Sequence, residues 1–184
     1  MAKSVVLKGN KVVLRPLSVK DAARFCRWLK DREVTKFLSI YDLAPPSLKE
    51  EREWIKKKSK SDVRFAIDTI DGQHIGSISL RLRGRSGKVA EYGIFIGDKK
   101  YHGQGLGTEA GRLIIDYGFR KLKLHRIFLR FIAYNFRGKR SYEKLGFSQE
   151  GIQRQHVFRN GHWHDQYLMG ILAEEWLKIK KLKK

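Results

Sequence analysis

The segment from residue 89 to residue 133 constrains the fold of this chain more than any other part of the sequence. Val89–Ile96 has the composition of a strand, and it leads into a glycine-rich loop. An amphipathic helix follows, in which the apolar residues from Leu106 to Tyr117 keep to one face. His125–Ala133 is then an almost continuous apolar run, which is typical of a strand buried on both faces. This strand–helix–strand unit predicts an α/β sheet rather than a β-sandwich.

The residues before this unit predict one strand and two helices. Lys11–Leu17 has the pattern of a strand, and Ser18 and Asp21 after it have the spacing of a capping box. Apolar residues at helical spacing then predict a helix from Val19 to about Lys30. A second helix is expected over Ser47–Lys58. Helices and strands therefore alternate from the start of the chain.

A hairpin is predicted next, because Phe65–Ile70 and His74–Leu80 flank Asp71-Gly72, a pair suited to the positive φ angles of a tight turn. Arg81–Lys88 is expected to be a basic loop. Together with the strand–helix–strand unit, this hairpin predicts one mixed sheet in a single α/β domain.

The C-terminal part predicts one more helix and two strands. Asn135 is a suitable N-cap for a short helix that ends at Gly146. Two strands are expected over Phe147–Phe158 and Trp163–Leu172. We assign residues 1–176 to one domain and residues 177–184, which carry five lysines, to a frayed basic tail.

The charge of the chain limits its partners. Forty Lys and Arg residues against nineteen Asp and Glu residues give a net charge of +21 at pH 7. This surplus favours anionic partners, such as a phosphate-rich cofactor, nucleic acid or an acidic protein surface. Cys26 is the only cysteine, so an internal disulfide and a thiolate metal cluster are excluded. The sequence has no signal peptide and no run of about 18 apolar residues, so we expect a cytoplasmic protein without membrane contact.

The most informative stretch is Tyr101–Ala110, with the sequence YHGQGLGTEA. Gly103, Gly105 and Gly107 leave successive backbone N–H groups unshielded directly before a helix N-terminus, where these donors and the helix dipole attract anions. The spacing matches neither the Walker phosphate loop nor the Gly-x-Gly-x-x-Gly dinucleotide motif. The loop therefore predicts an anion site, and a flexible turn without a ligand is the alternative.

Two motifs together resemble one enzyme family. His102–Ala110 is similar to the acetyl-CoA loop of the GCN5-related N-acetyltransferase (GNAT) family, and Asn135–Phe147 is similar to its Asn-x-x-Ala-x-x-x-Tyr-x-Lys-x-Gly-Phe segment. Val13–Leu17 and Arg159–Asp165 resemble the RimJ/RimL-like subgroup, which acetylates ribosomal proteins and small amines. The resemblance spans about Lys11 to Trp176. It implies a mixed, mostly antiparallel central sheet flanked by helices, and transfer of the acetyl group of acetyl-CoA to a primary amine.

The resemblance also implies roles for particular residues. Glu91 is expected to remove the amine proton through a water molecule, and Tyr142 to protonate the departing thiolate. Backbone N–H groups near Phe95 and Ile96 are expected to hold the pantetheine and the acyl oxygen. The other predicted cofactor contacts are His102, Gly103, Gln104, Gly105, Leu106, Gly107, Thr108, Asn135, Arg137 and Arg140. From the residues alone, the alternatives are that Glu91 is a solvent-facing strand residue and that Tyr142 is a core aromatic.

Two positions depart from the family pattern. His102 stands where the family usually has Arg or Gln, although backbone donors of the loop still suffice for a pyrophosphate. Gly138 stands where the ribosomal-protein subgroup often has serine, which moves the expected proton donor to Tyr142. His162 and His164 share one side of a strand, but they lack a third spaced ligand, so no metal site is predicted.

The identity of the acceptor is less constrained by the sequence. Neutralising an α-amino group at pH 7 costs about 1.4 kcal/mol, against about 4.6 kcal/mol for a lysine-like amine, which favours a protein or peptide N-terminus. A polyamine is one alternative acceptor. Six carboxylates could bind such a polycation: Asp31, Glu33, Asp42, Glu50, Glu51 and Glu53. A non-catalytic RNA- or ribosome-binding module is the alternative from another class, supported by Lys56–Lys60 and the lysine-rich tail. The sequence leaves open whether the protein forms a homodimer.

Overall fold

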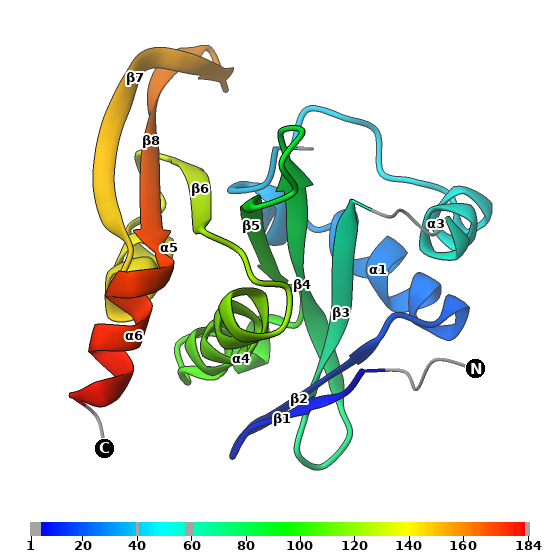
Figure 1. The fold of residues 1–184 in the computed structure, drawn as a ribbon. Helices are drawn as coiled ribbons and strands as arrows, with labels where there is room; N and C mark the ends of the chain where they lie inside the picture. Colours follow the sequence, from blue (N-terminus) through cyan, green and yellow to red (C-terminus); the bar gives the residue numbers. More distant parts are fainter. Residues whose placement is uncertain (1–4, 40, 58–60, 183–184) are drawn as a thin grey trace.

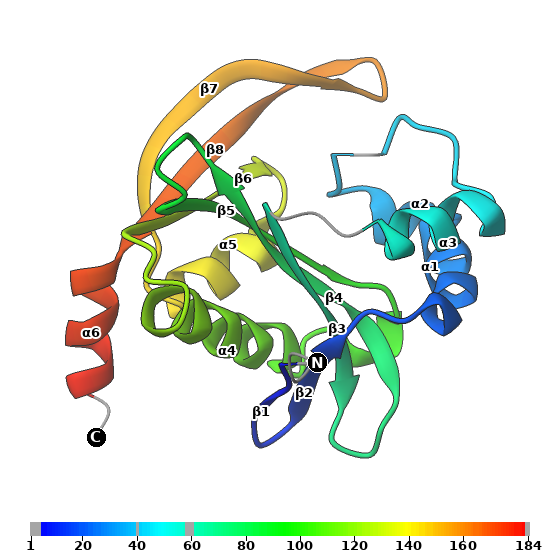
Figure 2. The ribbon, with the colours of Figure 1, turned by 45° about the vertical axis from the view of Figure 1, so that its right-hand side comes forward.

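The computed structural model describes residues 5–39, 41–57 and 61–182, which form one eight-stranded sheet with helices on both faces (Figures 1 and 2). The strand order is β1-β2-β3-β4-β5-β6-β8-β7, and every neighbouring pair is antiparallel except β5–β6, which is parallel. The bounds are β1 Leu7–Lys8, β2 Val12–Pro16, β3 Asp62–Thr69, β4 His74–Arg83, β5 Val89–Ile96, β6 Arg126–Ile132, β7 Ser148–Arg159 and β8 His162–Leu172. The predicted mixed, mostly antiparallel sheet is confirmed.

Two helices begin where capping side chains predicted them to begin. Ser18 and Asp21 form a capping box ahead of α1, and Asn135 caps α5 by accepting a hydrogen bond from the Gly138 N–H. Ser47 caps α3, although residue 58 of that predicted helix lies outside the described residues. The bounds are α1 Ala22–Leu29, α2 Arg32–Thr35, α3 Leu48–Lys56, α4 Leu106–Arg120, α5 Phe136–Lys144 and α6 Ala173–Lys181, with short 3-10 turns η1 Val19–Asp21 and η2 Lys99–Tyr101.

The two faces of the sheet are covered unequally. The main hydrophobic core lies between the sheet and α4, and fully buried residues such as Leu80, Ile114 and Ile127 belong to it. A smaller cluster on the other face includes Phe25 and Trp28 of α1, whose rings contact Phe95 of β5. That face is covered only in part, which leaves room for a site on the sheet.

Side-chain alternation places charged residues on the partly covered face. Leu80 of β4 lies against α4, because a Cβ on Gly118 of that helix would come within 2.9 Å of its Cδ1. Arg81 and Arg83 therefore project from the opposite face, since successive strand residues alternate. Glu91 of β5 follows the same rule, because Ala90 before it and Tyr92 after it are buried in the main core.

The parallel pair β5–β6 separates soon after it forms. Only Val89–Glu91 pair with Arg126–Phe128, although β5 continues to Ile96 and β6 to Ile132. Beyond this point β5 stays bonded to β4, and β6 stays bonded to β8. The two halves of the sheet therefore splay apart at the C-terminal ends of β5 and β6.

Three parts of the fold differ from the sequence-based expectation. β1 and α2 were not predicted, and β4 runs on to Arg83, so the predicted loop Arg81–Lys88 is shorter. The predicted frayed tail, residues 177–184, is helical as far as Lys181, and residues 183–184 lie outside the described part. The physical reason is amphipathic packing: Trp176 donates to Asp116 of α4, Lys180 pairs with the same carboxylate, and Ile179 packs on the core.

Candidate active site

The loop between β5 and α4 has the backbone geometry that its glycines predicted. Gly103 and Gly105 each have a φ of +78°, in the left-handed region that favours glycine. A Cβ at either position would meet no atom within 4 Å, so the loop presents its bare backbone to open space. Gly105 is the N-cap of α4, and the first turn of that helix leaves N–H groups without intrahelical partners. Free donors in this arrangement are suited to bind an anion.

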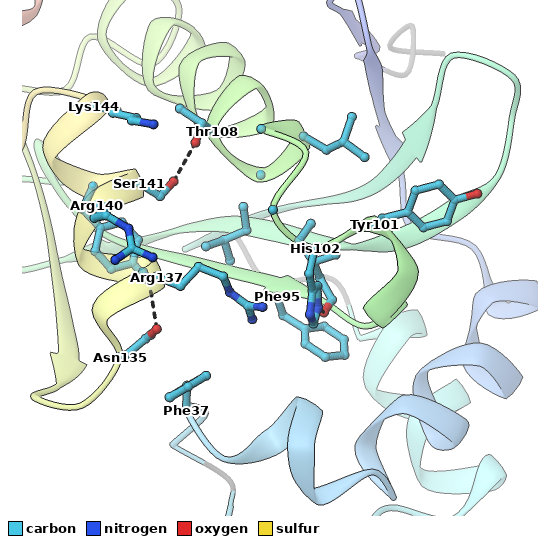
Figure 3. Close-up of a pocket in the computed structure, with 18 of the residues that line it drawn as sticks. Phe37, Phe95, Tyr101, His102, Thr108, Asn135, Arg137, Arg140, Ser141 and Lys144 are labelled. Atoms are coloured by element: carbon cyan, nitrogen blue, oxygen red, sulfur yellow. Dashed lines mark hydrogen bonds between the residues drawn. The ribbon is translucent and has the colours of Figure 1, made fainter.

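A cleft of about 280 Å³, hereafter the glycine-loop cleft, opens at this loop between β5 and α5 (Figure 3). Its lining residues are Val34, Phe37, Leu38, Ile94, Phe95, Ile96, Tyr101, His102, Gly103, Gly105, Leu106, Gly107, Thr108, Asn135, Arg137, Gly138, Arg140, Ser141, Tyr142 and Lys144. The cleft therefore follows the splay between β5 and β6, with the anion site of the loop at one end.

One face of α5 supplies cationic groups to this cleft. Arg137, Arg140 and Lys144 line it together with Ser141, and their spacing places all four on one side of the helix. The hydroxyl of Ser141 lies 2.9 Å from that of Thr108, which joins α5 to the first turn of α4. In Figure 3 the Arg137 side chain extends from α5 toward His102. Ser141 was not predicted, and the helical period of Arg137 and Arg140 is the signal that could have found it.

His102 stands where the family usually has Arg or Gln, and its ring is held by the backbone. Its Nε2–H donates to the carbonyl oxygen of Ile96 at 2.9 Å, which fixes the ring against the end of β5. Burial lowers the pKa of His102, and the nearby Arg137 guanidinium lowers it further. The imidazole is therefore neutral at pH 7, and the positive charge of the cleft comes from α5.

Asn135 and Gly138 depend on each other. Asn135 is 8% exposed, and its Oδ1 accepts the Gly138 N–H at 2.9 Å. A Cβ at position 138 would come within 2.6 Å of the Asn135 amide nitrogen, so a serine there would displace the capping side chain. The departure from the subgroup pattern at Gly138 thus has a local steric reason.

Tyr142 stands where the glycine-loop cleft meets a second cleft. Its ring packs against Tyr92 and Phe131, and no described residue forms a hydrogen bond with its hydroxyl. Desolvation raises the pKa of Tyr142 to about 12, so the phenol keeps its proton at physiological pH. A free, protonated hydroxyl at this junction is available to donate to a ligand.

The second cleft, of about 430 Å³, lies on the partly covered face of the sheet and is hereafter the arginine cleft. Glu91 lies here rather than in the glycine-loop cleft. Arg83 donates from Nε to Oε2 of Glu91 at 3.0 Å, and Arg130 donates from Nη2 to Oε1 at 2.8 Å. Burial would raise the pKa of Glu91, but the hydrogen bonds from the two guanidinium groups outweigh it and lower the pKa. The carboxylate is therefore ionised and held on both oxygens.

The segment after α2 closes both clefts with residues that sequence patterns did not reveal. Phe37 and Leu38 line both. They are held by Arg159, far along the chain, which donates to the Lys36 and Leu38 carbonyl oxygens at 2.8 and 2.6 Å. The Tyr134 hydroxyl donates a second hydrogen bond to the Lys36 carbonyl oxygen. No local motif signals a contact that joins segments more than a hundred residues apart.

The structure thus gathers most of the predicted site residues in one place. Every predicted cofactor contact lines the glycine-loop cleft except Gln104, whose side chain donates to the Lys100 carbonyl at 2.7 Å. Within the described residues no group of three or more His, Cys, Asp and Glu side chains is arranged to hold a metal ion. No helix in that part of the chain has the length and apolar character needed to cross a membrane.

Comparisons with known proteins agree with this geometry. The family model described as "Acetyltransferase (GNAT) domain" matches residues 11–148. Probable N-acetyltransferase YjcK of Bacillus subtilis is 36% identical over 91% of this chain and 97% of its own length. Putative ribosomal N-acetyltransferase YdaF of the same organism is 29% identical over 91% of this chain and 94% of its own.

A solved structure shows the same architecture. Spermidine N-acetyltransferase from Vibrio cholerae, in complex with CoA and spermine, superposes with a TM-score of 0.82 at 26% identity. The match covers 92% of this chain and 99% of that one. The family model, the relatives and the glycine-loop cleft agree, and the chain belongs to the GNAT family as an acetyl-CoA-dependent N-acetyltransferase.

Proposed function

We propose that this enzyme acetylates the α-amino group of a protein or peptide and belongs to the RimJ/RimL-like subgroup. The observation that carries the proposal is the junction of the two clefts at Tyr142. On one side lies an anion-binding loop, and on the other an open cleft whose charges are mainly cationic. An α-amino group is the acceptor that is easiest to present there as a neutral amine, because its pKa is about 8.

The residues of the glycine-loop cleft fit acetyl-CoA, which supplies an activated thioester when bound. The N–H groups of the loop would hold the pyrophosphate, and Arg137 and Arg140 would face the 3′-phosphate. The backbone of Phe95 and Ile96 would hold the pantetheine and polarise the acyl oxygen. Tyr142 would donate its proton toward the departing sulfur, a role that its free hydroxyl permits.

Glu91 is not suited to act as a strong general base. A carboxylate held by two guanidinium groups is a weak proton acceptor, because its pKa lies below the ordinary value. We propose that it accepts the amine proton through water, and that this matters most where the amine is still protonated. Glu91 and Tyr142 both line the arginine cleft, so both would be within reach of an amine bound there.

A polyamine is the second candidate acceptor, because the Vibrio cholerae relative bears spermine and is described as a spermidine acetyltransferase. Of the six carboxylates that could hold a polycation, however, five have partners within this chain and Glu51 is buried. Asp31 pairs with Lys99, Glu33 with Lys36, and Glu53 with Lys56. Asp42 lies 3.8 Å from Arg159, Glu50 completes the α3 capping box, and burial raises the pKa of Glu51. This pairing favours the peptide acceptor.

Ribosome contact through the basic surface would be an accessory to catalysis in a cytoplasmic enzyme. Some of the basic residues that suggest it, within 58–60 and 183–184, lie outside the described residues. Lys178 and Lys180, within the predicted tail, lie instead on α6. The basic surplus therefore supports docking on an anionic surface and does not replace the acetyl-transfer function.

The test is release of CoA from acetyl-CoA with three acceptors at equal concentration. These are a peptide with a free N-terminus and no lysine, an N-terminally blocked peptide with one lysine, and spermidine. We expect the free N-terminus to have the highest kcat/KM. A higher kcat/KM for spermidine would overturn the assigned acceptor, and no turnover with any amine would overturn the assigned reaction.

A further inference from the structure

The arginine cleft has an unusual charge arrangement for a site that receives an amine. Arg81 and Arg83 of β4, Glu91 of β5 and Arg130 of β6 line it, and strand alternation puts the β4 pair on the same face as Glu91. Arg81 has a carboxylate of its own, since its Nε lies 3.5 Å from Oδ1 of Asp62. Arg83 and Arg130 share the single charge of Glu91. The pair therefore retains one positive charge in the cleft.

Glu91 leaves some of the hydrogen-bond donors of Arg83 and Arg130 free. Each carries five N–H donors, and Glu91 engages only Nε and Nη2 of each. Among the described residues, none accepts a hydrogen bond from Nη1 of Arg83 or Arg130. The arginine side chains are 41% and 43% exposed, whereas that of Glu91 is 19% exposed. Glu91 thus lies beneath two arginines that present free donors to the cleft.

The same cleft contains an unused acceptor. Oε1 of Gln166, on β8, is buried and has no hydrogen-bond partner among the described residues, and Gln166 lines the cleft. A buried carbonyl oxygen without a partner is costly, but this one is screened from the open cleft. The groups that the cleft offers to a ligand are therefore the free donors of the two arginines.

We propose, resting on the function proposed above, that the acceptor carries a carboxylate within a few bonds of its amine. The Nη1 groups of Arg83 and Arg130 bind that carboxylate while the amine lies toward Tyr142. Planar guanidinium groups match a carboxylate in charge and in geometry, and their donors are already fixed by Glu91. A cleft of about 430 Å³ has the size of a small-ligand site.

Two sources supply this chemistry. One is an Asp or Glu side chain in the first two residues of a peptide or protein. The other is the main-chain carboxylate of a free amino acid or dipeptide. Both place a carboxylate near a primary α-amine, and both are recognised by the same pair of arginines.

The experiment compares matched acceptors on the unmodified enzyme, so it requires no variant to fold. The first arm uses Ala-Glu-Ala-amide against Ala-Gln-Ala-amide, and the second uses the dipeptide Ala-Ala against its amide. We expect kcat/KM to favour the acid by about 10-fold or more in at least one arm, which identifies the source. A ratio near one in both arms would overturn the proposal.

Variants then locate the effect. Arg130→Gln and Arg83→Gln should each lower the acid-to-neutral ratio about 10- to 100-fold. Using the ratio cancels any effect on catalysis that both acceptors share. Arg126→Gln is the matched control, since Arg126 lies on the same strand, pairs with Glu150 and lines neither cleft. An acid preference that survives both cleft substitutions would show that other residues recognise the carboxylate.

Calorimetric binding of the same peptides to the protein with CoA separates this inference from the function on which it rests. A binding preference for the acid without turnover would overturn the proposed reaction and leave the carboxylate site standing. If the acid and the neutral acceptor are turned over at equal rates and bind with equal affinities, the proposed reaction stands and the carboxylate site is overturned.

Discussion

The glycine-loop cleft and the arginine cleft share Tyr142 but are built from different parts of the polypeptide. The groups of the first that could bind an anion are backbone N–H groups of one loop and cationic side chains on one face of one helix, which are two short continuous segments. The second uses side chains of β4, β5, β6 and β8, which come together only through the pairing of the sheet. Backbone recognition suits a constant phosphate-bearing cofactor, whereas side-chain recognition can change from one relative to the next. On the proposed function, the cofactor contacts are encoded locally, and the acceptor contacts depend on the assembled sheet.

Replacing Tyr142 by Phe should have the largest effect, because Tyr142 serves both clefts. We expect kcat to fall by about 10²–10⁴-fold, the usual contribution of general acid catalysis, with little change in acetyl-CoA affinity. Initial rates with a good peptide acceptor and calorimetric titration with acetyl-CoA measure the two quantities.

Tyr117→Phe is the matched control for this substitution. Tyr117 lies on α4, packs against Phe65, and lines neither cleft. A kcat for Tyr142→Phe within a few fold of the Tyr117→Phe value would remove Tyr142 from the role of proton donor.

The contrast between the clefts also explains what could be predicted. Gly103, Gly105 and Asn135 act through local backbone geometry, which a short motif specifies completely. Phe37 lines the clefts because Arg159 hydrogen-bonds the backbone on either side of it, and Arg130 lines its cleft because of the strand order. Neither cause follows from local residue patterns. The fold class followed from alternating segments because hydrophobic periodicity is local.

The prediction of a frayed tail was wrong for α6 for a related reason. The high density of lysines in this segment indicated a tail without structure. Its packing depends on a distant partner, Asp116, which receives both Trp176 and Lys180. Charge density alone therefore gave the wrong structure for residues 177–181.

Replacing Gly105 by Val should have the next largest effect and should be confined to the glycine-loop cleft. The added side chain meets open space on the cleft side, and a valine is strained at a φ of +78°. We expect acetyl-CoA affinity to fall about 10- to 100-fold, because several charged hydrogen bonds are weakened. The shift of Tm on adding acetyl-CoA measures the loss.

Gly72→Val separates strain from binding. Gly72 has a φ of +85°, also with open space around its Cβ, but it lies in the β3–β4 turn away from both clefts. Both variants should lose similar intrinsic stability, and only Gly105→Val should lose the acetyl-CoA shift. If acetyl-CoA raises the Tm of both variants by the same amount, the loop backbone does not hold the phosphates.

The smallest effect is expected from Glu91→Gln, and its dependence on pH tests the side-chain cleft most closely. Hydrogen bonds from Arg83 and Arg130 outweigh burial and lower the pKa of Glu91, so the carboxylate is ionised at both pH 6 and pH 9. Its own titration therefore cannot produce a difference between these two values. The acceptor amine does change, because an α-amino group with a pKa of about 8 is mostly charged at pH 6 and mostly neutral at pH 9.

Loss of a proton acceptor should therefore lower kcat/KM by about 10-fold at pH 6 and by less at pH 9, where the amine has already lost its proton. Glu150→Gln is the matched control, because Glu150 is also held by a guanidinium group, that of Arg126, and lines neither cleft. An equal loss at both pH values would show that Glu91 serves only to position Arg83 and Arg130. The arginine cleft would then be a recognition site alone, and the proton would leave the amine directly to solvent.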